Sequence, residues 1–291
     1  MTFDPRLILF LALGVVGVMF LAAWARSLRG GKLAGNAAET PSPLETAIGF
    51  VTNFFDTLGI GSYAPTTALF RFFRLVPDER IPGTLTLGHT LPTIVQSFIF
   101  IAIVNVDFST LVLLILSSIG GAWLGAGVVA QWPKRNIQIG MGAALLVAAL
   151  LFSLANLGVV PAGGAALRLG GAKLGLAMGG NFLLGALMTL GIGLYGPCLI
   201  MISLLGMEPR VAFPIMMGSC AFLMPVAGAR FSRRQAYSAR PALGLAIGGI
   251  PAVLIAALIV KSMPLVAMRW LVVVVVLIAA AGLLRSAWRR E

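Results

Sequence analysis

Residues 57–65 read TLGIGSYAP, and residues 189–197 read TLGIGLYGP. Seven of the nine positions are identical at a constant offset of 132 residues, and the pair Pro77 and Pro82 recurs at that offset as Pro209 and Pro214. Repetition at a fixed offset indicates an internal duplication. In each copy two glycines and a proline interrupt an apolar segment, so the sequence predicts two related broken helices.

The composition places these segments in a membrane. Of the 291 residues, 59% are hydrophobic and only 10% are charged, whereas a soluble domain has roughly 25% charged residues. That excludes a soluble globular domain, and the low charge also excludes a disordered chain. The apolar runs lack the alternation of a membrane β-barrel. Cys198 and Cys220, both in apolar surroundings, do not indicate a disulfide framework. We therefore predict an all-α polytopic membrane protein.

Apolar runs of about 20 residues are long enough to cross a bilayer. They cover residues 7–25, 81–106, 108–133, 136–167, 211–229, 241–260 and 270–284, the last extended by 265–268. The first of these is read as a retained helix, because it is longer than the apolar region of a signal peptide. The two interrupted stretches, 44–74 and 173–206, each end in an arm too short to cross alone. We expect seven crossings and two re-entrant hairpins.

The basic residues orient these segments. If both interrupted stretches are re-entrant, 15 of the 21 basic residues lie on one side of the membrane; if both cross fully, the split is 12 against 9. The positive-inside rule favours the first arrangement, with the N-terminus outside and the C-terminus cytoplasmic. The net charge of +12 is then an orientation signal, and no nucleic-acid partner is expected.

The duplication also predicts the domain organisation. We expect an N-terminal helix and linker over residues 1–43, a first repeat over 44–155, a linker over 156–171, a second repeat over 172–285 and a cytoplasmic tail over 286–291. Each repeat would hold one hairpin and three crossings. Because three is odd, the second repeat would be inverted relative to the first. Inverted repeats with paired broken helices recur among transporters.

Each break predicts an anion-binding site. Glycine permits positive φ and leaves space for a ligand, and proline suits the first position of a helix, so Pro65 and Pro197 should begin the second arms. A helix N-terminus offers free N–H groups and the positive end of a dipole. Alternatively, the glycines only permit close helix packing. The expected substrate-binding residues are Gly59, Gly61, Ser62, Tyr63, Pro65, Thr66 and Thr67, with Gly191, Gly193, Tyr195, Gly196, Pro197 and Cys198.

Two titratable side chains are candidates for proton coupling or gating. Asp56 directly precedes the first break within an uncharged stretch, and its counterpart in the second copy is Met188. His89 is the one histidine of the chain and lies within an apolar run. Ionisable groups within a membrane are functional candidates, and histidine titrates near neutral pH. Alternatively, Asp56 lies near a membrane surface or bonds a freed backbone group, and His89 only joins two helices.

Further polar residues would support the site from behind. Thr93 and Gln96 share a helical face with His89. The expected supporting residues are Asn53, Gln96, Asn181, Ser219 and Cys220, which act either as donors to the site or as hydrogen bonds between helices. A single histidine excludes a multi-histidine metal site, and the chain has no Walker A loop. We expect no catalytic residue, metal or cofactor.

The repeated TLGIG-x-Y-x-P segment in a small hydrophobic chain resembles the sulfite exporter TauE/SafE family of membrane permeases. The resemblance covers residues 44–285, and most of it lies between Gly49 and Pro92. It implies gradient-driven transport of a small sulfur-containing anion, such as sulfite, thiosulfate, sulfoacetate or another organosulfonate, across a bacterial inner membrane. The residues that match the family-like hairpins are Gly59, Gly61, Tyr63 and Pro65, with Gly191, Gly193, Tyr195 and Pro197.

Two other functions fit the same motifs. A passive anion channel would use the same helix ends without a titrating group. An intramembrane sulfur-transfer enzyme would use Cys198 or Cys220 as the nucleophile, and Cys198 is the better candidate because a helix N-terminus lowers a thiol pKa. In the leading interpretation the partners are a small anionic substrate and the lipid bilayer, and the sequence does not indicate an oligomeric state.

Overall fold

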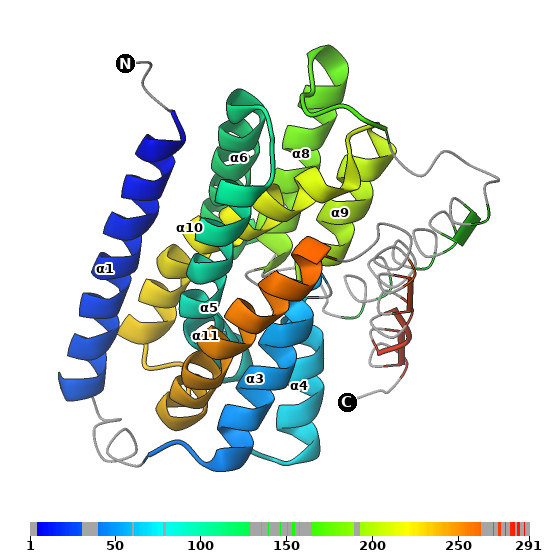
Figure 1. Cartoon of the computed structure of the whole chain (residues 1–291). Helices are drawn as coiled ribbons and strands as arrows, with labels where there is room; N and C mark the ends of the chain where they lie inside the picture. Colours follow the sequence, from blue (N-terminus) through cyan, green and yellow to red (C-terminus); the bar gives the residue numbers. More distant parts are fainter. Residues whose placement is uncertain are drawn as a thin grey trace.

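The computed structural model describes residues 5–30, 40–59, 61–77, 80–128, 164–188 and 193–262, with scattered positions between 129 and 163 and beyond 263. These residues form a bundle of α-helices (Figure 1). The helices of the first half are α1 (Arg6–Gly30), α3 (Pro43–Thr57), α4 (Tyr63–Phe72), α5 (Ile81–Ile103) and α6 (Phe108–Val128). Those of the second half are α8 (Gly171–Met188), α9 (Tyr195–Leu204), the short 3-10 helix η3 (Pro209–Val211), α10 (Ala212–Arg233) and α11 (Ala239–Ser262).

The exterior of the bundle is apolar and part of its interior is polar. Large apolar side chains point outward on several helices, for example Val18 on α1, which is 67% exposed, and Leu258 on α11, which is 73% exposed. By contrast, α5 buries seven polar side chains: Thr84, Thr86, His89, Thr90, Thr93, Gln96 and Ser97. An apolar exterior is what the hydrocarbon of a bilayer requires.

Five helices are long and apolar enough to cross a membrane. Their spans are Arg6–Leu28, Ile81–Ile103, Gly171–Met188, Pro209–Arg233 and Ala239–Ile259. The described residues therefore form an all-α membrane protein, as the sequence predicted. The expected crossing at 108–133 corresponds to α6, in which Phe108–Leu124 forms a shorter apolar helix. The expected crossings at 136–167 and 270–284 fall mostly outside the described residues.

The two interrupted stretches lie at opposite ends of the bundle. In Figure 1, α3 and α4 occupy the lower part of the molecule, and α8 and α9 occupy the upper part. α3 packs against α4, and α8 packs against α9. Each pair runs from its own end of the bundle to the middle, where the chain turns back. This is the course expected of a hairpin that enters and returns.

Each hairpin is held by a helix from the other half of the chain. α3 packs along α11, and α8 packs along α6. Glycines make both approaches possible: Gly248 of α11 lies directly against the carbonyl oxygen of Thr46, and Gly121 of α6 lies against that of Phe182. A side chain at either glycine would collide with the backbone of its neighbour. The centrally placed α5 and α10 pack against each other, and α1 lies outside them against α10.

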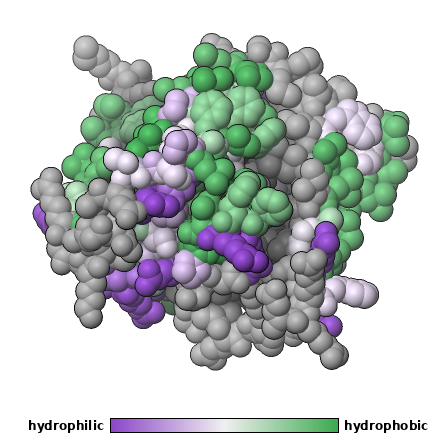
Figure 2. Space-filling view, turned by 90° about the horizontal axis from the view of Figure 1, so that it is seen from below, coloured by the Kyte–Doolittle hydropathy of each residue, from purple (hydrophilic) through white to green (hydrophobic). Residues whose placement is uncertain are grey.

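Arginines gather at the lower end of the bundle, where α1, α4 and α10 end and α3, α5 and α11 begin. Figure 2 looks at this end and shows hydrophilic side chains among apolar ones. The arginines in these described segments are Arg26, Arg71, Arg74, Arg80, Arg230, Arg233, Arg234 and Arg240. Three of the five basic segments that re-entrant hairpins would place on one side of the membrane thus share one end of the described part of the protein, and the other two, at 134–135 and 285–290, fall mostly outside the described residues.

An ion pair between a buried carboxylate and a partly exposed arginine fixes the start of the first hairpin at this end. The Glu45 side chain is fully buried and accepts a hydrogen bond from the Arg240 guanidinium at 3.1 Å. Glu45 also closes a capping box with Ser42, in which the Ser42 N–H donates to Glu45 at 2.7 Å and the Glu45 N–H donates to the Ser42 hydroxyl at 3.2 Å. Such a box satisfies two N–H groups that a helix start leaves unpaired. The first hairpin therefore begins at a defined position against α11.

Candidate functional site

The two breaks meet in the middle of the bundle. A Cβ atom placed on Gly61 would lie 3.8 Å from the Cβ of Tyr195, and one placed on Gly193 would lie 3.9 Å from the Cβ of Tyr63. Each break therefore contacts the first helical residue of the opposite hairpin. In the first break Gly59 and Gly61 have φ of +94° and +87°, which glycine adopts without the strain that a side chain would cause.

The second arms begin two residues earlier than the sequence predicted. α4 starts at Tyr63 and α9 at Tyr195, so Pro65 and Pro197 are the third residues of their helices and not the first. Both prolines remain compatible with a helix, because the N–H groups of the first turn have no partner within it. The earlier start brings the two tyrosines, instead of the prolines, to the meeting point of the hairpins.

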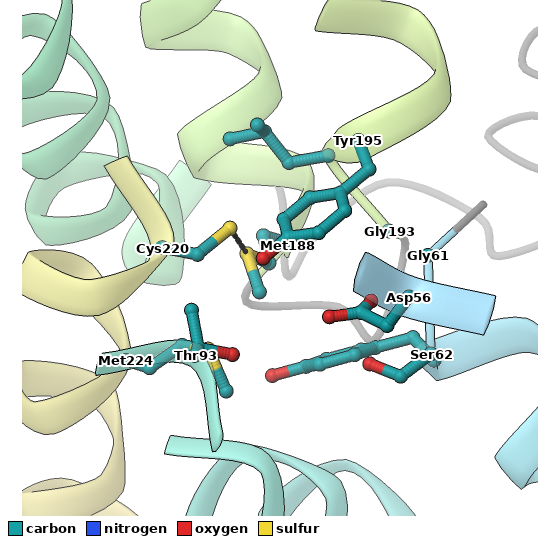
Figure 3. Close-up of a pocket in the computed structure, with 11 residues that line it drawn as sticks. Asp56, Gly61, Ser62, Thr93, Met188, Gly193, Tyr195, Cys220 and Met224 are labelled. Carbon is teal, nitrogen blue, oxygen red and sulfur yellow. Dashed lines mark hydrogen bonds between the residues drawn. The ribbon is translucent and has the colours of Figure 1, made fainter. Parts of the chain in front are cut away.

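A small cavity lies between the breaks (Figure 3). Only about 10 Å³ is open to the centre of a water-sized sphere, which corresponds to roughly one water molecule. Its lining comes from both halves of the chain: Asp56, Gly61, Ser62, Tyr63, Thr93, Met188, Gly193, Leu194, Tyr195, Cys220 and Met224. The N-terminal residues of α4 and α9 are among them, so the first turns of both short helices face this space.

Eight of these lining residues form four pairs that are separated by the repeat offset of 132 residues. The pairs are Asp56 with Met188, Gly61 with Gly193, Ser62 with Leu194 and Tyr63 with Tyr195. The glycines and tyrosines are the same in both copies. The other two pairs place a polar side chain in the first copy and an apolar one in the second, so the cavity has one polar and one apolar wall.

Asp56 is the centre of the polar wall. It lies in the last turn of α3, and the residue is 2% exposed. Its carboxylate accepts a hydrogen bond from the Gln96 amide at 2.9 Å, and the same amide nitrogen donates to the Thr57 hydroxyl at 2.9 Å. Gln96 in turn accepts a hydrogen bond from the Tyr195 hydroxyl at 2.7 Å. Gln96 therefore connects the end of α3 with the start of α9.

The apolar wall contains sulfur atoms. The Cys220 thiol of α10 donates to the thioether of Met188 at 3.4 Å, and Met224 lies one turn further along α10. Figure 3 shows Cys220 and Met188 in contact on the side of the cavity away from Asp56 and Ser62. An anion in this space would meet hydroxyl groups and a carboxyl group on one side and polarisable sulfur atoms on the other.

His89 does not line the cavity. Its Nδ1 lies 3.0 Å from the Asn53 side-chain oxygen, and its Nε2 lies 3.1 Å from the Thr66 hydroxyl. His89 thus joins α5 to both arms of the first hairpin. This is the interhelical role that is the alternative to proton coupling. Because Asp56 lines the cavity and His89 does not, Asp56 is the better placed of the two titratable candidates.

The second half has a simpler counterpart of this cluster. The Asn181 amide of α8 donates to the Ser219 hydroxyl of α10 at 3.0 Å and to the Leu114 carbonyl at 2.7 Å. Asn53–His89 and Asn181–Ser219 therefore join the first arm of each hairpin to the long helix that follows it. Among the described residues, no bond from Ser219 to α9 takes the place of the Thr66–His89 contact.

Several residues expected to bind an anion lie away from the cavity. Thr66 and Cys198 are fully buried, but their backbone N–H groups donate to the carbonyls of Ser62 and Leu194 within the first turns of their helices. The Thr66 hydroxyl is bonded to the Ser62 carbonyl and to His89. Neither side chain lines the cavity, and the same holds for Gly59, Pro65, Thr67, Gly196 and Pro197. Gly191 lies outside the described residues.

Of the residues expected at the site or behind it, the structure brings seven to the cavity: Asp56, Gly61, Ser62, Tyr63, Gly193, Tyr195 and Cys220. Four others were not among the expected site residues, namely Thr93, Met188, Leu194 and Met224. Met188 and Leu194 could have been found by adding the repeat offset to Asp56 and Ser62. Thr93 shares a helical face with Gln96, whereas no sequence signal singles out Met224.

No metal-binding cluster is present in the described part of the chain, where no three His, Cys, Asp or Glu side chains come together. Comparisons of the chain with protein-family models, with curated proteins and with solved structures found no match. The geometry of the cavity and the sequence motifs are therefore the basis for assigning a function.

Proposed function

We propose that the protein is a secondary active transporter of a small sulfur-containing anion, built from two inverted repeats. The anion would bind between the two hairpins, at the N-terminal turns of α4 and α9. The fold supports transport, because several apolar helices surround a polar interior that reaches the middle of the bundle.

The observation that carries this proposal is the composition of the cavity. Four pairs of its lining residues are related by the repeat offset, and each break contacts the opposite hairpin. Paired broken helices that meet at a repeat interface are typical of substrate sites in secondary transporters, where half-helix N-termini face an anionic group. The first turns of α4 and α9 offer such N–H groups at both sides of one space.

The helix positions support the inverted repeats. α9 begins and ends 132 residues after α4. In the same order along the chain, α8 corresponds to α3, α10 to α5 and α11 to α6. The packing partners correspond as well: α3 of the first half contacts α11 of the second, and α8 of the second half contacts α6 of the first. The hairpins enter from opposite ends of the bundle (Figure 1). A twofold axis in the membrane plane would relate such an arrangement.

The cavity is too small for a sulfur oxyanion, so the hairpins must part for substrate to enter. The two hairpins differ in their hydrogen bonds to α5, because α9 is joined to it through Tyr195, whereas α4 is joined to it through both Tyr63 and Thr66. Alternating access would follow from movement of one repeat against the other. On this proposal the protein resides in a bacterial inner membrane, with its arginine-rich end in the cytoplasm.

The choice of a sulfur anion rests on the resemblance to the TauE/SafE permeases, and the sulfur-lined wall is compatible with it. The sulfur-transfer enzyme is the weaker alternative, because Cys198 does not line the cavity and the Cys220 thiol, which does, donates to the thioether of Met188. A passive channel would share the cavity but would move anions only down their own gradient.

Uptake into proteoliposomes tests the proposal. Purified protein is reconstituted, and labelled sulfite, thiosulfate and sulfoacetate are offered with and without a pH gradient. We expect at least one anion to accumulate above its external concentration when the gradient is present. Uptake that only equilibrates would indicate a channel. No uptake of any of the three, by protein that elutes as a single folded species, would contradict the proposed function.

A further inference from the structure

We infer that Asp56 is the coupling group: it carries a proton whenever an anion occupies the cavity, and the Asp56–Gln96–Tyr195 link passes this state to the second hairpin. Each anion therefore moves together with one proton. This inference rests on the proposed function and adds to it the coupling ion, the stoichiometry and two positioning residues.

The first argument is the charge of the cavity. Of the described residues that line the cavity, Asp56 is the one acidic residue, and none is a lysine, arginine or histidine. A carboxylate and an anion in one nearly dry space repel each other strongly. A protonated carboxyl group, by contrast, offers an O–H donor. The site therefore accepts an anion only in its protonated form.

The surroundings of Asp56 contain no cation that could substitute for the proton. Its titratable neighbours are Tyr63 from α4, Tyr195 from α9 and Cys220 from α10, and α8 contributes the uncharged Met188. On α5, Thr93 and Gln96 face the cavity, while His89 is turned toward Asn53 and Thr66. Along α11, Arg240 pairs with Glu45 at the other end of α3.

The second argument is the direction of the hydrogen bonds at Gln96. Its amide nitrogen donates to Asp56 and Thr57, and its oxygen accepts from the Tyr195 hydroxyl. A carboxylate is a much stronger acceptor than a neutral carboxyl group. Protonation of Asp56 therefore weakens its bond to Gln96 and loosens the Gln96–Tyr195 bond that holds α9 against α5. Proton binding and release of the second hairpin are thus connected through one side chain.

A counting experiment tests the stoichiometry without any variant. Sulfoacetate stays fully ionised near neutral pH, so its addition to the wild-type protein in detergent and weak buffer reports only protons taken up by the protein. We expect one proton for each bound anion. Binding without proton uptake would overturn the inference while leaving anion transport intact.

The Asp56→Asn variant tests the residue. It mimics the protonated state, so we expect proteoliposomes to exchange internal and external sulfoacetate but to lose gradient-driven accumulation. With the membrane potential clamped at zero, the wild type should accumulate anion about tenfold for each pH unit, and the variant should reach a ratio of one. Three results would contradict the inference. The folded variant could accumulate sulfoacetate as the wild type does, or it could fail to exchange sulfoacetate. The wild type could also lose accumulation when choline replaces Na⁺.

Asp107→Asn is the matched control. Asp107 precedes α6, and the Ser109 hydroxyl and the Thr110 N–H donate to its carboxylate at 2.6 and 2.9 Å. These bonds, the one from Ser109 first, hold the pKa of the Asp107 carboxyl below its usual range. Asparagine caps a helix about as well as aspartate. This variant should accumulate sulfoacetate as the wild type does.

Two tyrosine variants test the link itself. Tyr195→Phe removes the hydroxyl that donates to Gln96, whereas Tyr63→Phe removes one that donates to Thr86 at 3.2 Å within the first half. We expect Tyr195→Phe to transport fewer than one proton for each anion and Tyr63→Phe to keep the wild-type ratio, whatever its rate. Equal ratios in the two variants would contradict the role of Gln96. If the wild type moves none of the three anions, the proposed function fails instead.

Discussion

The two hairpins have the same backbone design but different side-chain chemistry. Both consist of a longer first arm, a glycine-rich break and a second arm of 10 residues that begins with a tyrosine. In the first hairpin the break is flanked by Asp56 and Ser62, and in the second the same positions are Met188 and Leu194. The shared residues give the cavity the same backbone shape on both sides, whereas the residues that differ give it one polar and one apolar wall.

The difference extends to the attachment of each hairpin. The first is joined to α5 through His89, which contacts both of its arms, and the second is joined to α10 through a single Asn181–Ser219 bond. In its hydrogen bonds to the helix that follows it the first hairpin is thus the more firmly attached, whereas α9 of the second hairpin is held by the packing of its buried side chains. We expect the first hairpin to hold the proton and the anion.

The largest expected effect comes from the glycines that seat the hairpins. Gly248→Leu would drive a side chain into the Thr46 carbonyl of α3, and because backbone cannot yield easily we expect a loss of about 3 kcal/mol or more in the free energy of unfolding. Gly179→Leu on α8 is the control, since nothing lies within 4 Å of its Cβ position. Similar thermal stability of the two variants in detergent would show that α3 does not need this close approach.

A smaller effect is expected from the two polar clusters, Asn53–His89 and Asn181–Ser219. His89→Ala removes two hydrogen bonds and leaves a cavity, so we expect a loss of about 2–4 kcal/mol. Ser219→Ala removes one hydrogen bond and little volume, for an expected loss of about 1 kcal/mol. Both can be measured as shifts in thermal unfolding in the same detergent. If Ser219→Ala were the more damaging, the second hairpin would be the firmly held one.

The smallest effect separates the two breaks. Gly61 has φ of +87°, so Gly61→Ala should cost about 1–2 kcal/mol from backbone strain although its Cβ would meet only an ordinary contact. Gly193 has no positive φ and similar space, and Gly193→Ala should change stability by less than about 0.5 kcal/mol. Equal losses would mean that the breaks have more similar backbones than the structure shows.

Much of the fold could be predicted from the sequence, because the membrane limits the choice of structures. Composition alone indicated an all-α membrane protein, and the repeated glycine and proline pattern located both breaks. The starts of α4 and α9 were misplaced by two residues, because proline fits any position of the first helical turn and so does not mark the first residue. Packing of α3 on α11 and of α8 on α6 depends on tertiary contacts that no local pattern contains.

The site could be predicted only in part. The repeat offset and the position of Asp56 before the break pointed to residues that line the cavity. The repeat offset does not say where a side chain points, however. It therefore did not reveal that Thr66 contacts His89 or that Cys198 does not line the cavity. Met224 enters the lining from α10, one turn beyond the expected Cys220, and no sequence signal singles it out.

The two cysteines offer the most direct test of the shared cavity as the anion site. Cys220 lines the cavity and Cys198 does not. A Cys198→Ser variant therefore keeps one thiol, Cys220, in the cavity lining, and a Cys220→Ser variant keeps one thiol, Cys198, outside it. The rate of alkylation by N-ethylmaleimide is measured with and without sulfoacetate. We predict that sulfoacetate slows the reaction at Cys220 and leaves the rate at Cys198 unchanged. Equal protection of both, protection of neither, or a Cys220 that never reacts would contradict an anion site that opens between the hairpins.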